Sequence, residues 1–205
     1  MRWILASASP RRRELLKQID LPFEVFPSEA DENIVRETPA LLVEELSRRK
    51  CLDVANRTED SCLVLGADTV VALDGRILGK PGTKERAREM LRMLSGREHV
   101  VCTGVTLAEC TKGKPRRTVT FSETTRVFLY SLSESEIAEY VESGEPMDKA
   151  GAYGIQGRFA KFVRKIDGDY NNVVGLPLSR VYQEIKKLRL SDEKRGRRGE
   201  LYAER

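Results

Sequence analysis

The sequence predicts an α/β fold built on one mixed β-sheet. Segments with the two-residue period of strands alternate with segments of helical period along most of the chain. Two long strand patterns flank the short turn "TKGKP" and predict a hairpin that extends the sheet. With 205 residues, 40% of them hydrophobic and 33% charged, the chain has the composition of a globular protein with one well-buried core.

The N-terminal half opens with a strand that leads directly into a helix. Ser9 is a favoured N-cap and Pro10 suits the first helical position, so together they predict where this helix begins. The apolar run "CLVLGADTVVAL" predicts a buried strand, broken near Gly66, and "GRIL" predicts its hairpin partner. The predicted elements are strand 2–6, helix 10–19, strand 23–26, helix 40–57, strand 62–73 and strand 75–78.

The C-terminal half is predicted to place the hairpin between two helices. Thr83 opens the first helix and Gly96 ends it. Ser133 and Glu136 have the spacing of a capping box for the second helix, which ends at Gly144. The predicted elements are a helix from Thr83, strands 98–110 and 115–130, helix 133–143, a glycine-rich loop over 151–157, strand 159–166 and helix 178–188.

Domain organisation follows from the same patterns. Residues 1–188 are predicted to form one domain, whereas the charged tail 189–205 lacks apolar periodicity and is expected to be frayed or disordered. The chain has no run of 18 apolar residues and no secretory signal segment, which predicts a cytoplasmic protein with no membrane contact. The cysteines lack C-x-x-C spacing, which favours reduced thiols over a zinc site; they are Cys51, Cys62, Cys102 and Cys110.

The net charge of +4 is weak support for a nucleic-acid partner. Part of it lies in the tail 189–205, which is more simply interpreted as a solvated end than as a binding arm. Aromatic residues make up 6% of the chain and do not interleave with the Arg/Lys runs, so no stable nucleic-acid binding is expected.

The stretch "LASASPRRRELL" places three arginines in the first turn of a helix, where the macrodipole favours acidic residues. Helical spacing puts Arg11 and Arg12 beside the buried face of Leu15 and Leu16, while Arg13 points elsewhere. Two guanidiniums, the free N–H groups of the turn and nearby serine hydroxyls suit a multiply charged anion such as a phosphate. The alternative is a solvated arginine run with a surface ion pair.

Asp68 interrupts an apolar strand, where a carboxylate is costly unless it is paired, hydrogen-bonded or metal-bound. Either it satisfies a bulge at Gly66, or it faces a phosphate site together with acidic residues of the loop that contains Glu32. Lys50 leaves the apolar face of its helix, where it either extends to solvent or meets an anion. Lys80 lies in the tight connection "LGKP".

Two nucleotide-binding motifs are excluded. The sequence around Lys80 does not have the spacing of G-x-x-x-x-G-K-[ST], because three residues separate Gly75 from Gly79 and Pro81 replaces the Ser or Thr. The loop "GAYGIQG" is not G-x-G-x-x-G and does not open a helix. Neither a P-loop nor a Rossmann dinucleotide site is therefore predicted.

Motifs spread from residue 4 to 188 resemble the Maf family of nucleoside triphosphate pyrophosphatases, in that family's order. They are "ILASASPRRRELL", "GADTVV", "LGKP", "MLSGREHVVCTGV", "DKAGAYGIQG" and "YNNVVGLPL". The resemblance implies an elongated, twisted mixed sheet with a deep central cleft between two lobes, similar to inosine triphosphate pyrophosphatases. It also implies cytoplasmic hydrolysis of a nucleoside triphosphate to the monophosphate and pyrophosphate with a divalent cation, Mg²⁺ or Mn²⁺. The S-P-R-R, A-D-T and G-I-Q-G segments resemble the branch that acts on dTTP and UTP.

The resemblance also assigns site residues by position. For phosphate binding it implies Ser7, Arg11, Arg12 and Lys149. For catalysis and metal binding it implies Asp68, as proton acceptor or metal ligand, with Lys50, Lys80 and Glu32. For base preference it implies Arg11, Thr69 and Gln156. The Gln156 amide offers both a donor and an acceptor to the O4/N3–H edge of thymine or uracil.

The implied mechanism is in-line attack of water on the α-phosphorus with departure of pyrophosphate, assisted mainly by electrostatics and positioning. A homodimer follows from the resemblance alone, as do roles in restraining cell division and in keeping non-standard nucleotides out of nucleic acids. The alternative function is a regulatory module that binds nucleotides without turnover.

Overall fold

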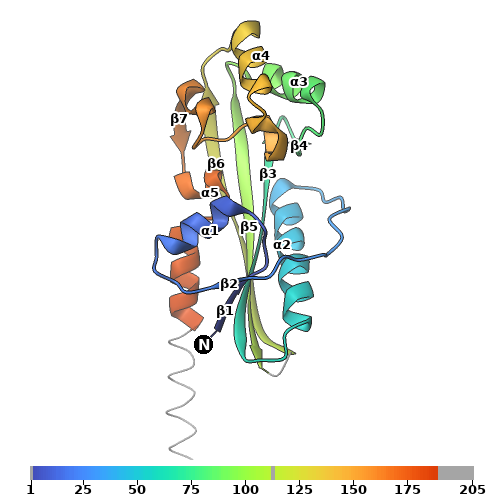
Figure 1. The fold of residues 1–205 in the computed structure, drawn as a ribbon, viewed down its shortest axis with the longest axis vertical. Helices are drawn as coiled ribbons and strands as arrows, with labels where there is room; N and C mark the ends of the chain where they lie inside the picture. The colour runs from blue at the N-terminus through green and yellow to red at the C-terminus, as the bar shows by residue number, and fades with distance from the viewer. Residues whose placement is uncertain (1, 112–113, 189–205) are drawn as a thin grey trace, which may run out of the picture.

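The computed structural model describes residues 2–111 and 114–188, so the predicted tail 189–205 lies outside the described residues. Within them the chain forms an elongated, twisted seven-stranded sheet flanked by helices (Figure 1). Strand β1 is parallel to β2 and β3, whereas the remaining pairings are antiparallel. The predicted α/β class with a mixed sheet is therefore confirmed.

The sheet has the strand order β2-β1-β3-β5-β6-β7, and β4 pairs with β3. The hairpin of β5 and β6 runs along the long axis of the molecule (Figure 1), as the sequence predicts. The strands are β1 (Arg2–Leu5), β2 (Glu24–Val25), β3 (Cys62–Leu73), β4 (Arg76–Leu78), β5 (Glu98–Thr111), β6 (Lys114–Leu129) and β7 (Val163–Asp167).

Helices begin where the capping signals predict. The Thr83 hydroxyl accepts from the Arg86 amide at 3.2 Å, and Ser133 and Glu136 form the predicted capping box. Figure 1 shows α3 and α4 together at one end of the molecule. The helices are α1 (Pro10–Lys17), α2 (Pro39–Asn56), α3 (Lys84–Leu94), α4 (Glu134–Glu142) and α5 (Tyr170–Val174), and residues 178–188 are also helical.

Strand β3 is covered on both faces. Val64 packs in a cluster with Val54 of α2, whereas its neighbour Leu65 packs in the main core with Leu15 of α1. In Figure 1, α2 lies on one side of the sheet, and α1, α5 and the helix 178–188 lie on the other. Burial of both faces explains why β3 reads as a continuous apolar run.

The predicted break near Gly66 is wrong, and so is a bulge there. Gly66 pairs with Thr106 in an uninterrupted β3–β5 register. A Cβ at residue 66 would lie 2.6 Å from the Cys51 amide nitrogen of α2. This glycine therefore lets the α2 backbone lie directly on the strand, which a sequence pattern does not distinguish from a break.

The predicted strand 159–166 begins later than expected. Residues Arg158–Phe162 form a 3-10 helix, η3, and the strand β7 starts at Val163. Phe159 and Phe162 are both buried, and their spacing of three suits a 3-10 turn better than a strand. The short helix α5 and the 3-10 turns η1 (Glu145–Asp148) and η2 (Ala150–Ala152) are not predicted, because they are too short to show a period.

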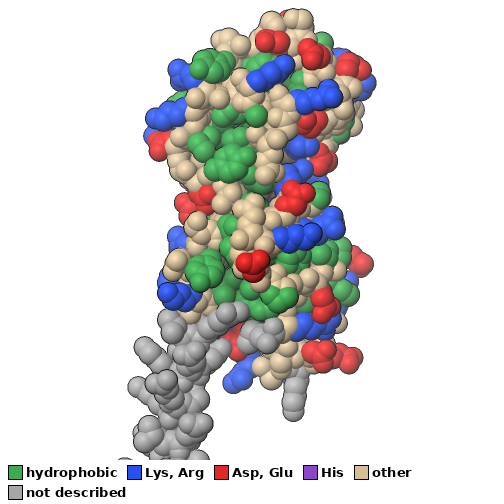
Figure 2. Space-filling model, turned by 60° about the vertical axis from the view of Figure 1, so that its left-hand side comes forward, with side chains coloured by type: hydrophobic (Ala, Val, Ile, Leu, Met, Phe, Trp, Pro, Cys, Tyr) green, Lys and Arg blue, Asp and Glu red, His purple; other side chains and the backbone are tan. Residues whose placement is uncertain are grey.

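The surface carries interspersed charges of both signs on the face that Figure 2 shows. Among the described residues, no helix combines the length and the apolar composition that a membrane crossing requires. All four cysteines are buried and none forms a disulfide, as the sequence predicts.

His99 is the single histidine of the chain, and it is 2% exposed at the start of β5. Its Nε2 is hydrogen-bonded to the Tyr153 hydroxyl at 2.7 Å, while Nδ1 has no partner among the described residues. Burial lowers the pKa of His99 to about 4. The imidazole is therefore neutral in the folded protein at neutral pH.

We predict that His99 makes the protein less stable between pH 6.5 and 4. Over this range the unfolded chain binds a proton at residue 99 and the folded protein does not, so the free energy of unfolding falls by about 3 kcal/mol as the pH drops. Urea unfolding of the wild type and of His99→Asn at several pH values measures this difference. Parallel pH profiles for the two proteins would contradict it.

Candidate functional site

The buried guanidinium of Arg12 joins three separate elements. Arg12 lies in the first turn of α1 and is 8% exposed. Its Nε donates to the Gly175 carbonyl at 2.8 Å, Nη1 donates to the Ser7 hydroxyl at 3.0 Å, and Nη2 donates to Oγ1 of Thr69 at 3.0 Å. The alternative of a solvated arginine run is therefore wrong for Arg12, whereas Arg13 is exposed as predicted.

Arg12 supplies a fixed positive charge at this point. Burial lowers the pKa of Arg12 from its ordinary value, and the negative charges of Asp68 and Glu32 oppose that shift. A guanidinium stays protonated in proteins even so. Since its hydrogen bonds hold it to Ser7 before α1, to β3 and to the turn after α5, its position does not depend on a ligand.

Thr69 belongs to a polar network that continues across the sheet. Its hydroxyl is hydrogen-bonded to that of Thr103 on β5 at 2.9 Å, and the Thr103 hydroxyl donates to the Asn172 carbonyl in α5 at 3.0 Å. Thr103 is fully buried. The structure thus places Thr69 in contact with Arg12, and it links the middle of the sheet to α5.

Lys50 reaches from α2 to the carboxylate of Asp68 in β3. Its Nζ forms an ion pair with Asp68 Oδ1 and a second with Glu32 Oε1 at 2.8 Å. The Lys50 and Asp68 side chains are 12% and 13% exposed, whereas that of Glu32 is 61% exposed. Lys50 therefore meets an anion at the end of the apolar face, which is one of its two predicted outcomes.

Asp68 and Glu32 suit a divalent cation that also contacts a ligand. Both carboxylates converge on one atom, Lys50 Nζ, so oxygens from two elements face a common cation position. The described residues contain no group of three or more His, Cys, Asp or Glu side chains that could hold a metal ion. Two carboxylates completed by phosphate oxygens are nevertheless a usual environment for Mg²⁺.

Arg11 and Lys149 share one carboxylate. Arg11 Nη1 donates to Asp148 Oδ2 at 3.0 Å, and Lys149 Nζ donates to Asp148 Oδ1 at 2.7 Å. Although burial raises the pKa of Asp148, its hydrogen bonds with Lys149 and Arg11 prevail and lower that pKa to about 2. Asp148 is thus a permanent anion that holds two of the predicted phosphate-binding cations together.

Lys80 and Gln156 are exposed residues of two neighbouring loops. Neither side chain makes a hydrogen bond or ion pair with the described residues. The Gly79 carbonyl accepts from the Gly151 amide at 3.1 Å, which places the connection containing Lys80 beside the loop that leads to Gln156. Both side chains are therefore available to a ligand.

The start of α1 keeps its backbone donors. Ser9 is the N-cap residue as predicted, but its side chain makes no capping hydrogen bond. Instead, the Ser9 amide donates to the Ser7 hydroxyl at 3.3 Å. The N–H groups of the first turn are thus not used by a cap, and they lie beside the cationic side chains of Arg11 and Arg12.

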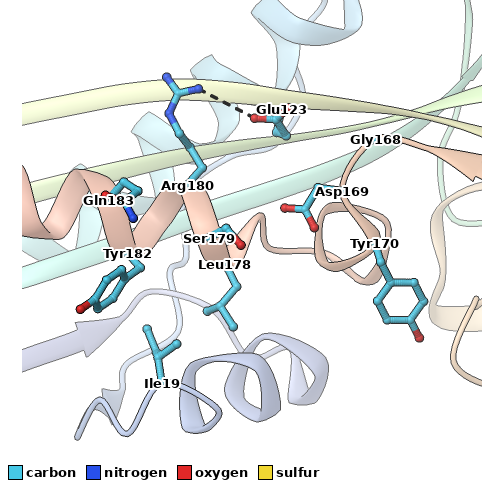
Figure 3. Close-up of a pocket in the computed structure, with 10 residues that line it drawn as sticks. All are labelled: Ile19, Glu123, Gly168, Asp169, Tyr170, Leu178, Ser179, Arg180, Tyr182 and Gln183. Atoms are coloured by element: carbon cyan, nitrogen blue, oxygen red, sulfur yellow. Dashed lines mark ion pairs between the residues drawn. The ribbon is translucent and has the colours of Figure 1, made fainter.

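A separate open pocket of about 820 Å³ lies between the end of α1, β6 and the helix 178–188 (Figure 3). Ile19, Leu178 and Tyr182 form an apolar side, and Arg180 pairs with Glu123 at 3.8 Å. None of the predicted site residues lines this pocket. The candidate site is therefore the set of cations and carboxylates described above.

Three contributors to the site are not predicted from the sequence. Asp148 precedes Lys149, and an acid beside a lysine is too common a pair to indicate a shared counter-ion. The Gly175 carbonyl is a backbone group and leaves no sequence signal. Thr103 lies in a long strand whose pattern shows burial but not a polar partner.

The fold and site together define a class of protein. It is an α/β protein in which Arg and Lys side chains, free helix N–H donors and two carboxylates that share one lysine lie around the start of α1. The comparison with families is specific: the chain matches the Maf-like protein family over residues 2–188, and it belongs to that family.

Close relatives carry one common name. A dTTP/UTP pyrophosphatase of Agathobacter rectalis is 52% identical over 197 residues, covering 90% of this chain and 96% of the relative. A dTTP/UTP pyrophosphatase of Carboxydothermus hydrogenoformans is 50% identical over 186 residues, covering 91% and 98% of the two chains.

Solved structures with a similar arrangement include a HAM1 protein from Coxiella burnetii. It has a TM-score of 0.49 and 16% identity, with coverage of 91% of this chain and 99% of that chain. The dITP/XTP pyrophosphatase from Mycobacterium abscessus aligns with a TM-score of 0.40 and 14% identity over 63% of this chain and 74% of that chain.

The two neighbouring arginines should differ in their effects. We predict that Arg12→Lys lowers the free energy of unfolding by about 3 kcal/mol. The reason is that a buried lysine ammonium cannot make the three hydrogen bonds that the planar guanidinium makes to Ser7, Thr69 and Gly175. Arg11→Ala should cost only about 0.5 kcal/mol, because its ion pair with Asp148 is exposed. Urea unfolding measures both values.

The same variants test anion binding. Arg11→Ala should weaken binding of inorganic tripolyphosphate, measured by calorimetry, by about tenfold. Arg13→Ala is the matched control, because Arg13 is exposed on the same helix turn and should leave the affinity unchanged. Equal losses in the two variants would contradict the assignment of Arg11.

Proposed function

We propose that this protein is a nucleoside triphosphate pyrophosphatase that hydrolyses dTTP and UTP to the monophosphate and pyrophosphate. The observation that carries the proposal is the nearly buried Asp68–Lys50 pair beside the cationic start of α1. The names of relatives about half identical over nine tenths of the chain support the same substrates.

Phosphate binding is assigned to groups that already hold anions. Arg11 and Lys149 bind the Asp148 carboxylate, and a triphosphate would take over part of this pairing. The exposed ammonium of Lys80 adds a further cation. Arg12 contributes its fixed charge and the orientation of α1, while Ser7 offers its hydroxyl. These charges would stabilise the leaving pyrophosphate.

Asp68 is the proposed proton acceptor or metal ligand. Lys50 holds its carboxylate in one position and keeps it close to Glu32. Asp68 and Glu32 would hold the Mg²⁺ or Mn²⁺ ion, which neutralises phosphate charge and makes a bound water more acidic. Water aligned opposite the leaving group would attack the α-phosphorus as its bond to the pyrophosphate oxygen breaks, and Asp68 would serve either by accepting the proton of this water or by holding the metal.

Base preference is assigned to Gln156. Its exposed amide can donate to O4 and accept from N3–H of thymine or uracil, whereas cytosine presents the opposite pattern at these positions. Arg11 lies at the edge of the same region, since it binds Asp148 next to Lys149. Thr69 would act through Arg12, whose Nη2 it binds.

We expect the purified protein to release pyrophosphate from dTTP and UTP, and much less from CTP, dATP, GTP or 7-methyl-GTP. Release should require Mg²⁺ or Mn²⁺ and stop with EDTA, because the Asp68 and Glu32 carboxylates would repel a triphosphate unless a divalent cation lies between them. A coupled pyrophosphate assay measures this. Preference for a purine would overturn the assignment of Gln156, and nucleotide binding without release would favour the non-hydrolysing regulatory module.

Asp68→Asn should reduce pyrophosphate release at least about a hundredfold, because the amide can neither accept the proton nor replace a carboxylate ligand. Folding should persist, since Lys50 keeps its ion pair with Glu32. Circular dichroism checks the fold and steady-state kinetics check the rate. Asp60→Asn serves as the control, because Asp60 is exposed and, among the residues that the structure describes, its carboxylate pairs with Arg2 at the surface. Wild-type activity in Asp68→Asn would remove Asp68 from its role.

A further inference from the structure

The position of Gln156 depends on its backbone. The side chain makes no hydrogen bond with the described residues, so the loop over 153–158 decides where its amide lies. Inside the loop, the Gly157 amide donates to the Gly154 carbonyl at 3.2 Å and closes a turn around Gln156. Whatever fixes the two ends of this turn therefore fixes the Cα of Gln156, and with it the region that the amide can reach.

One pair of side chains binds both ends of the turn. The Gly154 amide donates to the Tyr140 hydroxyl at 3.2 Å, and the Arg158 amide donates to Glu145 Oε2 at 3.1 Å. The two side chains are joined to each other, because the Tyr140 hydroxyl donates to Glu145 Oε1 at 3.0 Å. Tyr140 at the end of α4 and Glu145 at the start of η1 thus form a single support.

Packing around this support leaves the turn little freedom. Tyr140 is 4% exposed, and its ring lies 5.0 Å from that of Phe159, just after the turn. A Cβ at residue 157 would lie 2.7 Å from Glu145 Oε2, so the absence of a side chain lets the backbone pack directly on the carboxylate. Burial, followed by the charge of Glu145, raises the pKa of Tyr140, which keeps its hydroxyl a donor.

The same support also reaches the phosphate-binding side. Lys149 Nζ donates to the backbone carbonyl of Glu145 at 2.6 Å. A Cβ at residue 154 would lie 2.5 Å from Lys149 Cε, so the turn rests on the stem of this lysine as well. The spacing between Lys149 and Gln156 is therefore set by contacts that share Glu145.

We propose that Tyr140 and Glu145 are positioning residues that determine base selectivity by holding Gln156 at a fixed place. The inference rests on the proposed function, because it concerns how that site distinguishes pyrimidines. Neither residue touches the nucleotide in this assignment. Their side chains bond the backbone of the turn, whereas Lys149 contacts only the backbone carbonyl of Glu145, so changing these side chains acts mainly on the turn and differs between bases that share the same triphosphate.

The test compares kcat and KM for dTTP, UTP and CTP in the wild type and in Tyr140→Phe. The phenylalanine keeps the ring packing against Phe159 but removes the hydroxyl bonds to Gly154 and Glu145. We expect the ratio of kcat/KM for dTTP over CTP to fall about tenfold, mainly through a higher KM for dTTP. A smaller fraction of folded protein would lower the apparent kcat/KM for dTTP and for CTP by the same factor, and the ratio of the two would stay unchanged.

Glu145→Gln provides the second variant. Its amide retains one acceptor oxygen, so it can keep one of the two bonds, and a smaller fall in the ratio is expected. Glu139→Gln on the same helix is the control, because Glu139 is exposed and its side chain makes no hydrogen bond with the described residues. An unchanged ratio in both Tyr140→Phe and Glu145→Gln would overturn the inference while leaving the proposed function intact. A wild type inactive toward dTTP and UTP would overturn both.

Discussion

The buried charge of Arg12 is the constraint on which the rest of the site depends. Its Nε lies 2.8 Å from the carbonyl of Gly175, which is 163 residues away in sequence. Its other two hydrogen bonds join the segment before α1 to the middle of β3, through the hydroxyls of Ser7 and Thr69. Because a buried guanidinium that loses its acceptors is strongly destabilising, Arg12 favours one arrangement of these three segments.

Three of the remaining cations of the site are paired within the protein. Lys50 is held by Asp68 and Glu32, and Arg11 and Lys149 are held by Asp148. In the proposed function, a polyphosphate would therefore displace carboxylates from these cations, in addition to meeting the exposed Lys80. This exchange favours ligands that carry several charges at the right spacing, since a single charge cannot replace both carboxylates.

Much of this arrangement could be predicted, for identifiable reasons. Arginines are unfavourable at the positive end of the α1 dipole, and the Asp68 carboxylate is unfavourable in an apolar strand. Conflicts of this kind between a residue and its local structure are typical of functional sites. Gly66 misled the prediction because a glycine at a close helix–strand contact has the same sequence signature as a break. The Gly175 carbonyl and the Tyr140–Glu145 support could not be predicted, because they depend on tertiary contacts between distant segments.

Strand β3 connects the two ends of the site through a very short piece of backbone. Asp68 faces Lys50, and three residues later Val71 lies against Gly151, whose added Cβ would be 2.9 Å from the valine. Three residues of strand span about 10 Å, and β5 pairs with the whole segment while β4 pairs with Val71. Inserting or deleting one residue here would turn one of these side chains to the opposite face. The length of this segment is therefore constrained separately from the chemistry of its side chains, because a change in length would separate Asp68 from Lys50 or Val71 from Gly151.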